Sequence, residues 1–257
     1  MEAETETQAR KLAKRALAKD PNCVDALVLL TRLDARSSKD VIDGLQKAVT
    51  AGERSLGSKF IRENAGHFWL IVETRPYMRA LAELADVLRG EGNYLAAIGH
   101  YEKLLELNPN DNQGVRDPLL GTYLVVGDLA GAGKLLKKYM NDSMANFAWG
   151  RVLERFLTGD LPGASAALEK ARKTNRFVEL YMSGQKAIPK SLPDMYSQGS
   201  EEEAIVCLDT QAAAWAEHME AVFWLLEQCA VDKAQANVLR MTQKKNAPTA
   251  AMRKKPQ

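Results

Sequence analysis

The amino-acid sequence predicts an all-α fold in which pairs of helices stack side by side into a solenoid. A glycine followed by asparagine or aspartate recurs at Gly92-Asn93, Gly127-Asp128 and Gly159-Asp160, at separations of 35 and 32 residues. On both sides of these turns, apolar residues follow the three- and four-residue spacing of an amphipathic helix. A period of about 34 residues is typical of repeat proteins, in which each helix pair buries its apolar face against the next pair.

The most complete unit runs from Pro76 to Asp111 and contains two helices joined by the first of these turns. Its apolar stripes are Leu81, Leu84 and Leu88 in the first helix, and Ala97, Tyr101, Leu104 and Leu105 in the second. Asn108 and Pro109 then end the unit, because proline cannot continue a helix. A helix-turn-helix unit of this length is typical of the tetratricopeptide repeat. We therefore predict a tetratricopeptide-like right-handed α-solenoid with a C-terminal capping helix.

The chain before this unit follows the same rule less regularly. In residues 1–50 we expect degenerate helical repeats, the first of which is a second helix without its partner and ends at Asp20-Pro21. A partner could cover the face that this helix leaves exposed. Ser37 and Ser38 are the N-cap candidates of the next pair. Residues 51–77 interrupt the period but are too apolar for a linker, so we expect a helical insertion there, in which Thr74 caps the next helix.

The rest of the chain divides into three further parts. Tetratricopeptide repeats are expected over residues 78–182, with aromatic residues such as Trp149 in the core between repeats. Residues 183–232 are expected to form a crossing loop and one capping helix, which begins with a capping box from Ser200 to Glu203 and covers the last face of the solenoid. Residues 233–257 are expected to be a basic, disordered tail.

Two segments, GHFWLIVETRPYMRA at residues 66–80 and NPNDNQGVR at residues 108–116, give a more specific resemblance. They resemble tetratricopeptide-repeat proteins related to the suppressor of tumorigenicity 7 family, and the likeness extends over roughly residues 53 to 226. Leu70 and Val115 stand where the family pattern has glycine and isoleucine. The resemblance implies helical-repeat scaffolding and no established reaction.

Five polar residues near these segments are the predicted partner-binding site: Arg75, Arg79, Asn112, Gln113 and Arg116. In stacked repeats the first helices line the concave surface, so Arg79 and Arg116 are expected to point into one groove. Two arginines there would suit a protein or peptide with acidic residues or a carboxylate terminus, because arginine binds carboxylates bidentately. The alternative is internal pairing, in which Arg75 or Arg79 binds Glu73, Glu83 or Asp111 and fastens two repeats together.

Composition and motifs favour an interaction scaffold over the other function classes. The 257-residue chain has a net charge of +2, but its last 18 residues carry six cations and no acid, which leaves −4 for the rest. An acidic body disfavours nucleic-acid binding, although the basic tail keeps that alternative open. We expect no enzymatic activity, cofactor or metal, and an enzyme with a site assembled from distant residues is the last alternative. We also expect a cytoplasmic protein that does not enter a membrane, whereas its oligomeric state is left open.

Overall fold

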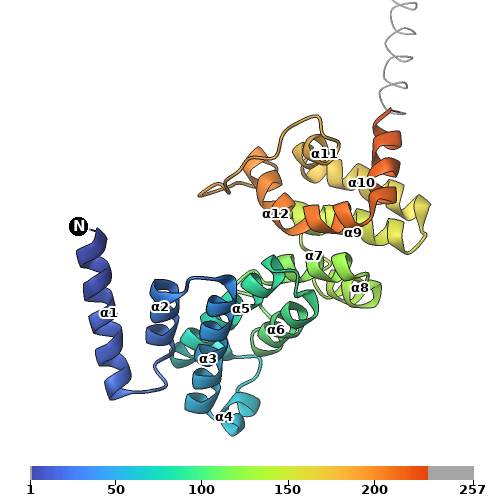
Figure 1. Ribbon diagram of the computed structural model, residues 1–257. Coiled ribbons are helices and arrows are strands. Elements are labelled where there is room, and N and C mark those ends of the chain that lie inside the picture. The colour runs from blue at the N-terminus through green and yellow to red at the C-terminus, as the bar shows by residue number, and fades with distance from the viewer. Residues whose placement is uncertain (1, 231–257) are drawn as a thin grey trace, which may run out of the picture.

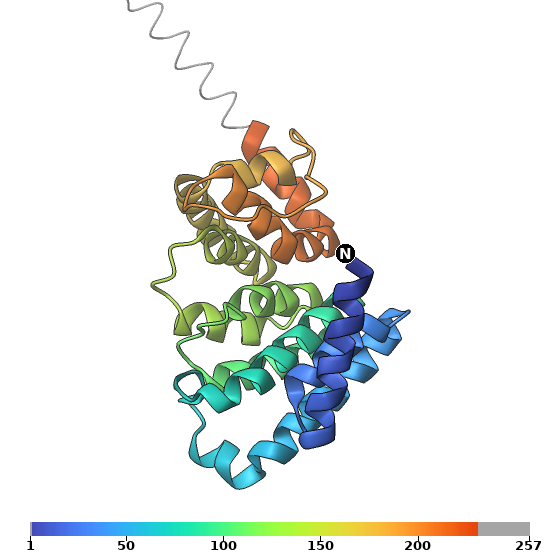
Figure 2. The same ribbon diagram turned by 90° about the vertical axis from the view of Figure 1, so that its left-hand side faces the viewer.

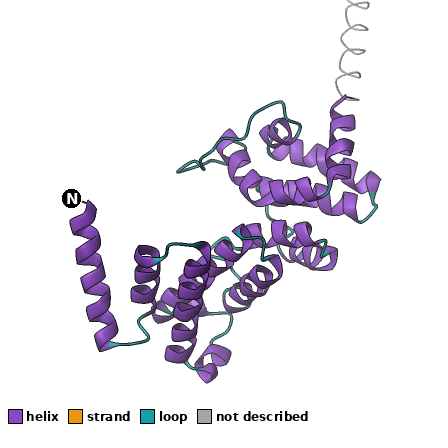
Figure 3. Cartoon of the chain, in the orientation of Figure 1, coloured by secondary structure: helices purple, strands orange, loops and turns teal. Residues whose placement is uncertain are grey.

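Helix pairs follow one another along the chain in the computed structural model, which describes residues 2–230 (Figure 1). The pairs are α2 (Val24–Asp34) with α3 (Ser38–Leu56), α5 (Arg75–Gly90) with α6 (Tyr94–Leu107), α7 (Arg116–Val126) with α8 (Leu129–Lys138), and α9 (Ala145–Leu157) with α10 (Leu161–Thr174). The second helix of each pair packs against the first helix of the next, as α3 does on α5 and α6 on α7. Figure 2 shows the successive layers, and Figure 3 shows only helices and loops in the described range. The predicted all-α solenoid is confirmed.

The three predicted turns share one geometry. Gly92, Gly127 and Gly159 have φ angles of 75°, 72° and 80°, a left-handed conformation that glycine adopts without steric strain. In each turn the next residue donates its amide to the carbonyl five residues earlier, which satisfies a free carbonyl at the helix end. These bonds are Asn93 to Leu88 (2.8 Å), Asp128 to Tyr123 (2.9 Å) and Asp160 to Arg155 (3.0 Å). The repeat in the sequence is therefore a repeat in backbone geometry.

Side-chain caps begin several of the helices. Ser38, one of the predicted candidates, is the first residue of α3, whereas the hydroxyls of Ser37 and Ser200 accept the amides of the third residue after them, which confirms these two caps. Asp128 and Asp160 do the same for α8 and α10. The predicted Thr74 cap is wrong, because this buried hydroxyl lies 2.5 and 2.8 Å from the carbonyl oxygens of Phe68 and Ile71. Thr74 therefore holds the preceding turns in place instead of capping α5.

Short helices separate α3 from α5. They are α4 (Ser58–Glu63) and two 3-10 turns, η1 (Phe68–Leu70) and η2 (Val72–Thr74). Phe68 is completely buried, with its ring 6.4 Å from the ring of Tyr77 at the start of α5. The amide of Gly66 donates to the carbonyl of Leu107 at the end of α6. These short helices are thus packed against the first tetratricopeptide pair.

Helix α1 (Glu2–Lys19) precedes the pairs and packs against α2. After α10 come α11 (Phe177–Met182), a loop over residues 183–200, and α12 (Glu201–Glu217). The sequence predicts a single capping helix, but α12 ends at Glu217 and a second helical segment covers residues 219–230. His218 separates the two, with its ring Nε2 2.9 Å from the carbonyl oxygen of Leu124. The basic tail lies outside the described residues.

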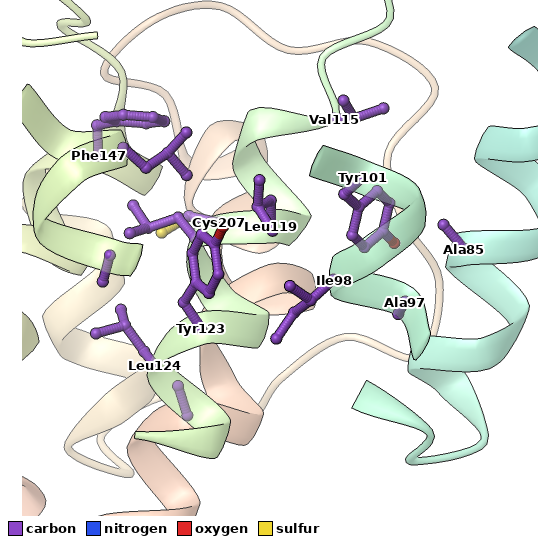
Figure 4. Close-up of a cluster of buried hydrophobic side chains, with 14 of the residues drawn as sticks. Ala85, Ala97, Ile98, Tyr101, Val115, Leu119, Tyr123, Leu124, Phe147 and Cys207 are labelled. Atoms are coloured by element: carbon purple, nitrogen blue, oxygen red, sulfur yellow. The ribbon is translucent and has the colours of Figure 1, made fainter. Parts of the chain in front are cut away.

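Apolar side chains from successive helices form one continuous core. Figure 4 shows part of it, where Ile98 and Tyr101 of α6 lie near Leu119 and Tyr123 of α7. Cys207 of α12 lies in the same cluster, so the last helices share the core of the repeats. Trp149, the largest completely buried side chain, is inter-repeat core as predicted, with its indole nitrogen donating to the carbonyl of Asn175.

Candidate functional site

The first helices of the pairs, α2, α5, α7 and α9, present a surface turned away from their second helices, which we call the first-helix face. Helix α5 buries its apolar residues and presents four charged residues on this face: Arg79, Glu83, Asp86 and Arg89. They follow one another at three- and four-residue steps, so they form a row along the helix. Asp86 accepts the hydroxyl of Tyr101 of α6 and Arg89 is bonded to Asp209 of α12, so the Arg79 end is the accessible part of this row.

Two ion pairs connect this row to α2. Arg79 donates to both carboxylate oxygens of Asp25, at 2.8 and 3.0 Å, and Arg32 donates to Glu83 at 2.9 Å through its Nε. The side chains of Arg79 and Asp25 are 55% and 59% exposed. An ion pair this accessible contributes at most about 1 kcal/mol to folding, so it can exchange partners readily.

Helix α12 covers the other part of the first-helix face, because it packs on α7 and α9 (Figure 1). The contact is close at Gly121 of α7, where an added Cβ would lie 2.0 Å from the backbone oxygen of Thr210. Only a glycine allows the two backbones to approach this closely. The predicted position of the capping helix, over the last face of the solenoid, is therefore wrong for α12.

A buried carboxylate fixes the N-terminal end of α12. Glu203 is 3% exposed and accepts three hydrogen bonds: from the amide of Ala145 (2.8 Å), the side chain of Asn175 (2.9 Å) and the amide of Gly199 (2.6 Å). Because Ala145 begins α9, the negative charge also lies at the positive end of that helix. Further along α12, Arg89 of α5 donates to the backbone and the carboxylate of Asp209, at 3.1 and 3.3 Å. Polar contacts thus hold α12 along its length.

Arg75, one of the predicted site residues, is half-buried and bonded within the protein. Its guanidinium donates to the carbonyl of Trp69 at 3.1 and 3.2 Å and lies over the indole ring, 5.1 Å from the ring centroid. Arg75 and Arg79 therefore bind different partners, Trp69 and Asp25, and do not form a pair of cations on one face.

Arg116 is also bonded internally, at the start of α7. Its guanidinium lies 2.8 Å from a carboxylate oxygen of Asp142 and 3.0 Å from one of Asp111, and over the ring of Tyr139. The carboxylates of Asp111 and Asp142 are 1% and 5% exposed. Asp111 also accepts the backbone amides of Val115 and Arg116. Arg116 is therefore the counter-charge of two buried acids.

The remaining two candidates lie in the loop before α7. Gln113 donates its side-chain amide to the carbonyl of Met78, whereas Asn112 is exposed. Among the five predicted residues, the structure thus leaves Arg79 and Asn112 at the surface and does not gather all five into one groove. Most of these residues are paired within the protein, as the alternative interpretation predicts. The partners differ from the predicted ones, because Arg79 binds Asp25 and Glu83 binds Arg32.

The carboxyl of Asp117, next to Arg116, titrates in an unusual range. Burial, together with the nearby carboxylates of Asp142 and Asp111, raises its pKa from 3.8 to about 6, and one of its oxygens is buried with no hydrogen-bond partner. The folded state therefore binds the proton more tightly than the unfolded state. The protonated carboxyl of Asp117 therefore contributes its full stabilisation of the fold below about pH 4, and this contribution is lost as the pH rises through about 6.

We accordingly expect Asp117→Asn to remove this pH dependence. A change of about two pKa units corresponds to about 3 kcal/mol, so the variant should be more stable than the parent at pH 7.5 by up to that amount and similar to it at pH 4. Urea unfolding curves of both proteins at the two pH values measure this difference. An equal effect at both pH values would contradict the proposed protonation.

One family model matches part of this chain. The family model of the tetratricopeptide repeat matches residues 78–111, which include most of α5 and all of α6. The chain therefore contains a repeat of a class that generally mediates protein–protein interaction. It is also similar to a solved chain, "Crystal structure of BtubC (BKLC) from P. vanneervenii", with 16% sequence identity over 77% of this chain and 97% of that chain, and a TM-score of 0.35. No curated protein matches the chain.

Two classes of feature are absent from residues 2–230. None of the helices described there is long and apolar enough to span a membrane. Over the same range, no group of three or more His, Cys, Asp or Glu side chains could hold a metal ion.

Proposed function

We propose that the protein is a non-catalytic scaffold that binds a protein or peptide segment on the part of the first-helix face that α12 leaves open. This part is formed by α2 and α5. The observation that carries the proposal is the division of the face, in which α12 occupies α7 and α9 while Arg79 of α5, together with Arg32 of α2, stays accessible. The likeness of residues 66–80 to the suppressor of tumorigenicity 7 family supports the same class, because that resemblance implies scaffolding.

The chemistry of the open part favours a partner with acidic groups. Arg32 and Arg79 present guanidinium groups there, 62% and 55% exposed, each paired with one carboxylate of this chain. A partner carboxylate can replace either internal carboxylate, because exposed pairs contribute little to folding and arginine binds carboxylates in a planar, bidentate way. Arg79 is thus the central contact residue of the proposed site. Asn112 is the second candidate, because its side chain is exposed.

Arg79→Glu tests the proposed surface. We expect this variant to lose partner binding by at least about tenfold, which corresponds to about 1.4 kcal/mol, because it places a negative charge beside Asp25 and Glu83. Its melting temperature and circular dichroism should stay close to those of the parent. The measurement is quantitative affinity capture from a cell extract with the intact chain, followed by titration of the captured protein once it has been purified.

Lys39→Glu is the matched control. It makes the same charge change on α3, where Lys39 is 81% exposed and pairs only with Asp43 of its own helix. The proposal requires a captured protein that the parent and Lys39→Glu bind equally and Arg79→Glu does not. If Arg79→Glu keeps the full set of captured proteins, the binding surface lies elsewhere.

A further inference from the structure

The outer face of α1 is basic. The helix packs on α2 through the side that contains Ala9, Ala13, Ala16 and Leu17 and exposes the opposite side. We call that opposite side the basic end face; its residues are Lys11, Leu12, Lys14, Arg15, Ala18 and Lys19. Residues 7–19 include no acid, and Leu12 at the side of this face is 50% exposed. The face thus combines an accessible apolar residue with four cations.

The helical segment 219–230 shows the opposite chemistry. It buries Ala221, Trp224 and Leu225, and its exposed side forms a face that we call the acidic end face: Met219, Glu220, Phe223, Leu226 and Glu227. Met219, Phe223 and Leu226 are 45%, 59% and 39% exposed and follow one another at four- and three-residue steps. This spacing makes one apolar stripe with carboxylates along its edge, the pattern of a helix that packs against a partner.

The charges on both faces are available. Between residues 2 and 230, no ion pair involves Lys11, Lys14 or Arg15, or Glu220 or Glu227. In Figure 1, α1 lies at one end of the stack of helices and segment 219–230 at the other. The two faces of one chain therefore lie apart from each other.

We propose that the acidic end face of one copy docks on the basic end face of a second copy, head to tail. Phe223 and its two apolar neighbours cover Leu12 and the aliphatic stems of Lys11 and Arg15, while the glutamates pair with the lysine and arginine head groups. Each end of a solenoid is the place where a further helix would stack, so the contact continues the packing of the repeats into the next molecule. Because the two faces differ, every added copy leaves one of each free, and the contact extends into rows or closes into a ring.

Sedimentation velocity of the full chain tests this association. We expect the average mass to rise with protein concentration, and we expect Phe223→Glu and Leu12→Glu each to weaken the association by at least about tenfold, since both place a charge in the apolar contact. Both positions are exposed, so circular dichroism and melting temperature should not change. A full chain that stays monomeric at all concentrations overturns the proposal, and so does association that neither variant affects.

Charge reversal identifies the two faces as partners. One variant combines Lys11→Glu, Lys14→Glu and Arg15→Glu, which leaves a net charge of −2 on the basic end face, and the other combines Glu220→Lys with Glu227→Lys. Each variant alone should stay monomeric, because its two faces then carry the same sign, whereas an equimolar mixture should associate, since both contacts in the mixture join opposite charges. A mixture that stays monomeric contradicts the pairing. Association that appears only after deletion of residues 240–257 shows that the chain's own basic terminus covers the acidic end face, which also overturns the proposal for the intact chain.

Discussion

Arg116→Ala is expected to lower the free energy of unfolding by about 3 kcal/mol, because removing one partner of a buried ion pair leaves the other charge uncompensated. Arg116 lies within hydrogen-bonding distance of both Asp111 and Asp142, and neither carboxylate is more than 5% exposed. Burial already raises the pKa of Asp111, and the charge of Arg116 opposes that rise. Without the guanidinium, the variant must bury two carboxylates or open the loop before α7.

Arg79→Ala is the matched control for this experiment. It removes the same side chain from an ion pair that is more than half exposed on both sides, so its effect should stay below about 1 kcal/mol. Urea unfolding followed by circular dichroism measures both variants. Equal, small losses would show that the Arg116 cluster contributes no more than a surface pair. Adding Asp142→Asn to Arg116→Ala should recover part of the loss, since it removes one of the two uncompensated carboxylates.

Gly121→Ala is expected to displace α12 from α7. The added methyl group would lie 2.0 Å from the backbone oxygen of Thr210, and a backbone cannot rotate away as a side chain can. Overpacking of this kind lowers the free energy of unfolding by about 1–3 kcal/mol, and here it acts on the contact by which α12 packs against α7. We therefore expect faster hydrogen exchange of the amides in residues 201–217 and faster proteolysis in the loop before them.

Gly99→Ala is the control that separates the effect of the contact with Thr210 from the effect of alanine on helix stability. Gly99 is inside α6, and an added Cβ there has no atom within 4 Å. Gly99→Ala should stabilise the chain by about 0.5–1 kcal/mol, because alanine favours the helix more than glycine does. Any difference between the two variants then reports the contact with Thr210. If Gly121→Ala behaves as Gly99→Ala does, α12 does not require the close approach.

The sequence alone predicts the helix pairs because their determinants are local. The three Gly-Asn and Gly-Asp turns, the serine caps at Ser37 and Ser200 and the apolar stripes all act within one or two turns of helix. Each of these signals agrees with the others, and such agreement across levels is what specifies a fold. The order in which the pairs stack follows from the regular spacing of the three turns along the sequence.

The position of α12 and the partners of the arginines depend on contacts between distant residues. Asp25 is 54 residues from Arg79, and Asp142 is 26 from Arg116, and many other carboxylates lie at comparable distances along the chain. One sign of a close helix contact in the sequence is Gly121, a glycine inside a helix between mostly apolar neighbours. The sequence predicts Glu203 as part of a capping box, but its bonds to Ala145 and Asn175 join residues that are 58 and 28 positions away in the sequence.

The division of the first-helix face limits the size of what can bind there. Neighbouring helices lie about 10 Å apart, so α2 and α5 together offer a footprint about 20 Å wide. An extended chain advances about 3.3 Å per residue, and roughly six residues therefore span this width. Since α12 borders this site on one side, the proposed function leads us to expect a short extended segment that crosses α2 and α5 and binds through a few side chains.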